Sequence, residues 1–190
     1  MAGRSVFVLL ASVVLWSGGA EAIQQVRSLY TAIDLGRCRA VAGEGARARL
    51  CSGLPGYPVY VAESPSAIYL SVGRDAASRQ AARQTLKSFN TLFPSGGHRT
   101  TVEWRFVVRE QRTVPYATIV RYFTESATGA GEVLVVTRVT AEETCQVAYI
   151  DALANGDAIV LARKVADTAA RRGPCPEKPE VYGAAGRSPM

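Results

Sequence analysis

The sequence predicts an α+β fold in which an antiparallel sheet packs against two helices, in the order β-β-α-β-β-β-β-α. Three observations predict it. Several stretches alternate apolar and polar residues with the two-residue period of a strand. Two other stretches consist of helix formers with apolar residues at helical spacing. Four cysteines are present, enough for two disulfides. We expect the sheet to comprise an N-terminal hairpin and a four-stranded meander.

The strands are expected in two groups. Residues 57–63 and 67–73 form the N-terminal hairpin, with a Ser-Pro-Ser turn between them. The meander comprises four strands joined by short links, at residues 101–109, 116–125, 132–139 and 144–151. In the first of these, Val102, Trp104 and Phe106 share one face and polar residues take the other, which predicts a half-buried strand.

Two helices complete the predicted order. Residues 74–89 contain no Gly or Pro, Asp75 is a suitable N-cap, and the inward stripe consists of Ala82, Leu86 and Phe89. Residues 158–172 carry a second apolar face, and Gly173-Pro174 ends that helix.

The N-terminus has the pattern of an export signal. Residues 1–22 combine Arg4, an apolar run over 6–16 and the small-x-small site Ala20-Glu21-Ala22, which predicts cleavage before Ile23. We therefore expect a signal peptide at 1–22, a single domain at 23–175 and a flexible, Pro- and Gly-rich tail at 176–190. No later segment is long and apolar enough to span a bilayer, so the mature chain is expected to have no transmembrane segment.

The cysteines of an exported chain are expected to be disulfide-bonded. A hairpin centred between Glu44 and Gly45 places Cys38 directly opposite Cys51. A strand of roughly 20 Å from Cys145 and a returning helix of roughly 23 Å bring Cys175 back beside Cys145. The sequence thus predicts Cys38–Cys51 and Cys145–Cys175. The spacings lack the Cys-x-x-Cys pairs typical of zinc and redox sites.

Catalytic motifs are absent from the sequence. The single histidine, His98, lies in a Gly-rich loop, and no nucleophile elbow, Walker loop or zinc motif is present, so no cofactor, metal or catalytic residue is assigned. Glu103 and Glu125 lie on neighbouring predicted strands and form a conceivable carboxylate pair for hydrolysis. Arg105 and Arg121 are equally close, so cross-strand ion pairs explain the same pattern.

The charge and the aromatic residues bear on possible partners. The net charge is +6, and the basic side chains are scattered, which favours a solvated surface of mixed sign or attraction to anionic envelope surfaces. Nucleic acid is not expected, since no binding motif appears. Tyr57 follows a rigid Leu-Pro-Gly turn, which either orders the hairpin or presents this side chain to a partner.

Four segments, at residues 30–34, 51–61, 115–123 and 148–155, together resemble small exported proteins of alphaproteobacteria. The resemblance extends over most of residues 30–175. It implies a Gram-negative periplasmic location, and it transfers no activity and no site residue.

Three functions are compatible with the sequence. The favoured hypothesis is an exported, non-catalytic periplasmic module that binds an envelope protein or an anionic envelope surface. The second is a carrier of a small ligand or lipid, whose apolar pocket would be lined by residues such as Trp104, Phe106 and Leu134. The third is a carboxylate-based hydrolase that uses Glu103 and Glu125.

Overall fold

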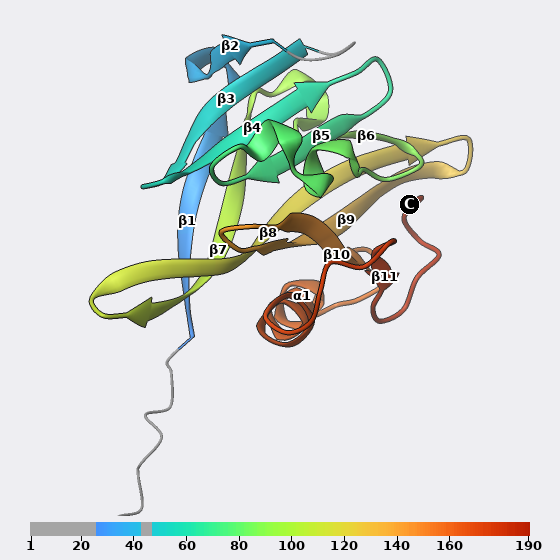
Figure 1. Ribbon diagram of the computed structural model, residues 1–190. Helices are drawn as coiled ribbons and strands as arrows, with labels where there is room; N and C mark the ends of the chain where they lie inside the picture. Colours follow the sequence, from blue (N-terminus) through green and yellow to red (C-terminus); the bar gives the residue numbers. More distant parts are fainter. Residues whose placement is uncertain (1–25, 43–46) are drawn as a thin grey trace, which may run out of the picture.

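The computed structural model describes residues 26–42 and 47–190, so the predicted signal peptide and the centre of the first hairpin lie outside the described residues. Strands dominate, in two sheets with a helix packed on one of them (Figure 1). This differs from the predicted α+β arrangement, which had one sheet, two helices and a different order of elements.

The large sheet has the order β1-β7-β8-β9-β10-β11, and β6 pairs with one end of β8. Its strands are β1 (Arg27–Asp34), β6 (Phe89–Thr91), β7 (Arg99–Arg109), β8 (Arg112–Ser126), β9 (Gly129–Val139), β10 (Thr144–Asp151) and β11 (Glu180–Val181). The four-stranded meander was predicted correctly. It consists of β7, β8, β9 and β10, each of which pairs antiparallel with the next through a short turn.

The small sheet has the order β2-β3-β4-β5, with β2 (Arg39–Val41), β3 (Arg47–Leu54), β4 (Tyr57–Glu63) and β5 (Ile68–Val72). The predicted hairpin of β4 and β5 is present, but it belongs to this separate sheet and does not extend the meander. The β2–β3 register pairs Arg39 with Leu50 and Val41 with Ala48, which is the symmetry predicted for a hairpin closed by Cys38 and Cys51.

Both predicted disulfides are present. Cys38–Cys51 has a Cα–Cα distance of 4.4 Å, and Cys145–Cys175 has one of 5.9 Å. The second bond joins the start of β10 to the segment after the last helix, as the length match between strand and helix predicted.

Two cores lie on opposite faces of the large sheet. Between the sheets, Val59, Val61 and Leu70 of the small sheet pack against side chains of the large sheet that include Trp104 and Tyr122. On the other face, the helical segment α1 (Ala158–Val165) and η5 (Ala166–Ala170) covers an apolar cluster that includes Ile119, Leu134 and Ile150. The domain therefore has three layers.

The helix predicted at 74–89 is wrong. The segment forms two short turns, η2 (Ala76–Ser78) and η3 (Gln80–Arg83), and then runs extended into β6. Asp75 has a left-handed backbone (φ 58°) and makes no capping hydrogen bond with its side chain. Two further short turns are η1 (Leu35–Arg37) and η4 (Pro94–Gly96).

Residues 176–190, expected as a flexible tail, pack against the domain instead. Strand β11 pairs parallel with β10, and Ser188 is buried and hydrogen-bonded to the Asp151 carboxylate. No helix in residues 26–42 and 47–190 is long and apolar enough to cross a membrane.

Candidate functional site

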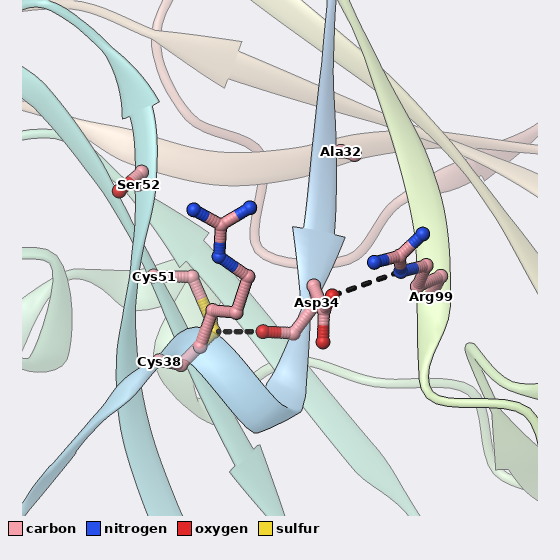
Figure 2. A pocket seen from close by; sticks show the side chains of 7 residues that line it. Ala32, Asp34, Cys38, Cys51, Ser52 and Arg99 are labelled. Atoms are coloured by element: carbon pink, nitrogen blue, oxygen red, sulfur yellow. Dashed lines mark hydrogen bonds and ion pairs between the residues drawn. A yellow bond between two sulfur atoms is a disulfide. The ribbon is translucent and has the colours of Figure 1, made fainter.

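A cavity of about 410 Å³ opens at the corner where β1 leaves the large sheet and β3 passes it (Figure 2). We call it the corner cavity. Its walls are contributed by β1, η1, β3 and β7, and they consist of Ala32, Asp34, Arg37, Cys38, Cys51, Ser52 and Arg99.

Local hydrogen bonds and the first disulfide position these side chains. Asp34 ends β1, and its carboxylate accepts a hydrogen bond of 3.1 Å from the Gly36 N–H, which caps η1. The Leu35 N–H donates to the His98 carbonyl at 3.0 Å, and this bond holds η1 beside the start of β7. The Cys38–Cys51 disulfide then ties the end of this turn to β3.

Figure 2 also shows a close contact between the Cys38 sulfur and the backbone of Asp34. Cys38 Sγ lies 3.1 Å from the Asp34 carbonyl oxygen, yet a disulfide sulfur carries no proton to donate. We therefore treat it as a close packing contact and assign it no hydrogen-bond energy.

The cavity has an excess of positive charge. Asp34 and Arg99 are directly opposite in the β1–β7 register, and Arg99 Nε donates to Asp34 Oδ2 at 2.8 Å. This hydrogen bond lowers the pKa of Asp34 below its ordinary value. Arg37 is exposed and makes no ion pair with any described residue. The walls thus hold two guanidinium groups and one carboxylate, which leaves one positive charge uncompensated.

This arrangement is suited to binding an anion. A carboxylate with a lowered pKa is a poor general base, so Asp34 is not poised to remove a proton near neutral pH. Arg37, the remaining N–H groups of Arg99 and the Ser52 hydroxyl offer donors for an oxyanion, and guanidinium groups match phosphate and carboxylate geometry.

Glu103 and Arg105, two of the binding candidates from the sequence, lie beneath the helix. Glu103 is 5 % exposed and Arg105 is 9 % exposed, although the alternation of β7 placed them opposite its core face. Arg163 of α1 donates to Glu103 through Nε at 2.7 Å. Arg105 donates to Asp167 of η5 at 2.9 Å through Nε and at 2.6 Å through Nη2.

The same network extends to neighbouring hydroxyl groups. Ser28 Oγ donates to Glu103 at 2.6 Å and accepts from Arg105 Nη1 at 2.6 Å. Tyr116 donates to Asp167 at 2.5 Å, and burial together with this hydrogen bond raises the pKa of Tyr116. Because both carboxylates are paired with arginines, the network fastens the helix to β1 and β7.

The geometry does not support a Glu103–Glu125 hydrolase. Ile119 lies opposite Glu103, and Glu125 is six residues further along β8, which corresponds to roughly 20 Å at 3.4 Å per residue. Two-carboxylate hydrolysis needs about 5–9.5 Å. Glu103 is moreover buried under the helix, whereas Glu125 is exposed.

The remaining candidates lie apart. Arg121 forms an ion pair with Glu132 on β9. Tyr57 packs edge-on against Trp104 with a centroid separation of 6.4 Å and adjoins the core between the sheets. Trp104 and Leu134, suggested for a carrier pocket, belong to the two cores on opposite faces of the large sheet, so they do not line one pocket.

Comparison with protein-family models, with curated proteins and with solved structures gives no match for this chain. Within the described ranges, no group of three His, Cys, Asp or Glu side chains is placed to hold a metal ion.

Sequence reasoning missed Arg37 and Arg99. Arg37 lies one residue before Cys38, so the predicted disulfide already held it in a rigid turn. The position of Arg99 depends on the pairing of β1 with β7, which are separated by more than sixty residues along the chain. No local pattern reports such a pairing.

Proposed function

We propose that this chain is an exported, disulfide-stabilised module that binds an anionic component of the cell envelope without catalysing a reaction on it. The observation that carries the proposal is the corner cavity, whose walls hold Arg37 and Arg99 but a single carboxylate, Asp34, which is paired with Arg99. The ligand group that fits this chemistry is a phosphate of a lipid headgroup.

Three further features support binding at this corner. The chain carries a net charge of +6, which attracts anionic surfaces over about 8–10 Å at physiological salt. The disulfide and the η1 hydrogen bonds hold the cavity walls before a ligand arrives, which reduces the entropy lost on binding. Ser52 is exposed at the cavity and adds a neutral donor.

The test is co-sedimentation of the oxidised mature protein with vesicles. We expect binding to vesicles that contain phosphatidylglycerol, weaker binding as NaCl is raised, and little binding to pure phosphatidylcholine. Arg37→Gln removes the cavity charge that we expect to donate hydrogen bonds to the phosphate, so binding to the anionic vesicles should be roughly tenfold weaker.

The matched control is Arg112→Gln, which removes the same charge from an exposed position on β8 outside the cavity. It should leave binding within about twofold of wild type, in line with the small contribution of one exposed charge. Equal losses for the two variants would mean that net charge, and not the corner cavity, binds the membrane. Absence of binding by the wild-type protein would reject the proposed function.

A further inference from the structure

A second hollow, of about 500 Å³, lies near the turn that joins β8 to β9. We call it the hairpin groove. Its walls include Phe89 of β6, Phe123 and Glu125 of β8, Glu132 of β9, Pro94 of η4, and Leu153 after β10.

The strand register explains why apolar side chains are exposed there. Phe89 lies opposite Glu125, and Phe123 lies opposite Glu132, on the face of the large sheet that carries the helix. The apolar cluster beneath the helical segment includes Ile119, Leu134 and Ile150, and it does not include Phe89 or Phe123. Phe89 remains 45 % exposed and Leu153 37 % exposed, although each is large and apolar.

The groove walls are held in place by the C-terminal segment. The Glu132 N–H donates to Ser188 Oγ at 3.0 Å, and the Leu153 N–H donates to Asp151 Oδ1 at 3.1 Å. The C-terminal segment also passes so close to Gly131 that a β-carbon at this position would lie 2.6 Å from Ser188 Cα. The groove is thus formed before any partner binds, which favours affinity.

The charge beside the groove is negative in a chain that is positive overall. Glu132 is paired with Arg121, whereas Glu125 makes no ion pair within residues 26–42 and 47–190. An apolar surface beside an uncompensated carboxylate is complementary to an apolar group beside a cation.

From this complementarity we infer that the hairpin groove binds a segment of a partner protein in which a Phe- or Leu-sized side chain adjoins Arg or Lys. The apolar side chain lies between Phe89, Phe123 and Leu153, and the cation pairs with Glu125. This inference does not depend on the corner cavity, because the two sites select ligand groups of opposite charge.

The experiment is an NMR titration of the isotopically labelled, oxidised mature protein with two peptides. One is acetyl-Gly-Phe-Arg-Gly-amide, and the other is acetyl-Gly-Phe-Glu-Gly-amide. We expect the first to shift the amide signals of the groove in a saturable manner, with the largest effects in β6 and near Glu125. The second should bind at least about threefold more weakly, since it places like charges together. Three results would each overturn the inference: equal affinity of the two peptides, signal shifts centred elsewhere, or no saturable shift at about 10 mM peptide. A concentration of about 10 mM is an order-of-magnitude upper limit for one weak contact.

Variants separate the two contributions. Glu125→Gln should weaken the Phe-Arg peptide by about two- to fivefold and leave the Phe-Glu peptide no weaker. Phe89→Ala removes an aromatic wall and should weaken both peptides by roughly tenfold. Glu110→Gln, which removes a carboxylate from the exposed turn at the opposite end of β8, is the matched control and should change neither. If Glu110→Gln has the effect of Glu125→Gln, the groove does not select the cation.

Discussion

At the scale of single residues, Asp151 has the most constrained carboxylate of the described chain. It is fully buried, and it accepts hydrogen bonds from the N–H groups of Leu153, Ala154, Arg187 and Ser188 and from the Ser188 hydroxyl. Burial by itself raises the pKa of a carboxyl group, but these hydrogen bonds outweigh it and lower the pKa of Asp151.

This arrangement predicts a destabilised and less pH-sensitive Asp151→Asn variant. The amide presents an N–H₂ group where donors converge, so the free energy of unfolding at pH 7 should fall by about 1–3 kcal/mol. The folded pKa of Asp151 lies below its unfolded value of about 3.9. Its stabilising contribution is therefore complete above about pH 5 and is lost as the pH falls toward the folded pKa.

The measurement is urea unfolding of both proteins between pH 7 and pH 3. Wild type should lose more stability than Asp151→Asn over this range. The control is Asp157→Asn, at an exposed position before α1, which should behave as wild type. A variant as acid-sensitive as wild type would show that Asp151 does not carry the effect.

At the scale of elements, the predicted C-terminal helix and the predicted helix at 74–89 had opposite outcomes. Residues 158–170 are helical, because an apolar face meets the large sheet and the Arg105–Asp167 and Arg163–Glu103 pairs fasten it. Helix propensity was equally good at 74–89, but propensity is a weak prior that tertiary contacts override.

Tertiary contacts hold residues 74–89 out of a helix. Ala76 packs on the outer face of the small sheet, whereas Leu86 enters the core between the sheets. The side-chain oxygen Oε1 of Gln84 accepts a hydrogen bond from the Gln146 main-chain N–H at 2.7 Å. The main-chain carbonyl oxygen of Gln84 accepts one from Gln146 Nε2 at 3.0 Å. One helix cannot reach all of these partners, and Gln146 is more than fifty residues away in the sequence.

The network beneath the helix predicts the effect of Asp167→Ala. This change leaves Arg105 without its bidentate partner at a position that is 11 % exposed in its side chain. We expect the free energy of unfolding to fall by about 3 kcal/mol, near the lower limit for breaking a buried ion pair, because Asp167 itself is partly exposed.

Urea unfolding followed by circular dichroism measures this loss. Lys164→Ala, an exposed change on the same helix, serves as the control and should cost less than about 0.5 kcal/mol. Similar losses for the two variants would contradict a specific role for the Arg105–Asp167 pair.

At the scale of the whole molecule, the two disulfides close loops of different length. Cys38 and Cys51 are 13 residues apart, and Cys145 and Cys175 are 30 apart. Since a longer loop loses more entropy on closure, replacing the first pair by Ala should cost about 3 kcal/mol and the second nearly 4 kcal/mol. Chemical unfolding of the two double-Ala variants checks this order. An equal or reversed order would mean that local contacts, and not loop closure, dominate.

The sequence by itself determined what depends on neighbouring residues. The strands of the meander and the β4–β5 hairpin follow from alternation, and the Cys38–Cys51 pairing follows from the symmetry of one hairpin. The Cys145–Cys175 pairing follows from the matched lengths of one strand and one helix. These features are short-range, so a linear pattern specifies them.

Only the tertiary structure decided which surfaces meet. It separated β2 to β5 into a second sheet, placed β1 beside β7, packed the C-terminal segment against Asp151 and covered Glu103 with the helix. Both candidate sites depend on these long-range pairings, because each draws its walls from strands far apart in the chain. The reason is physical. The free energy gained by burying an apolar face is roughly proportional to the apolar area removed from water and has no preferred direction. Many partners could therefore cover one apolar face, and only the packing of the whole domain selects among them.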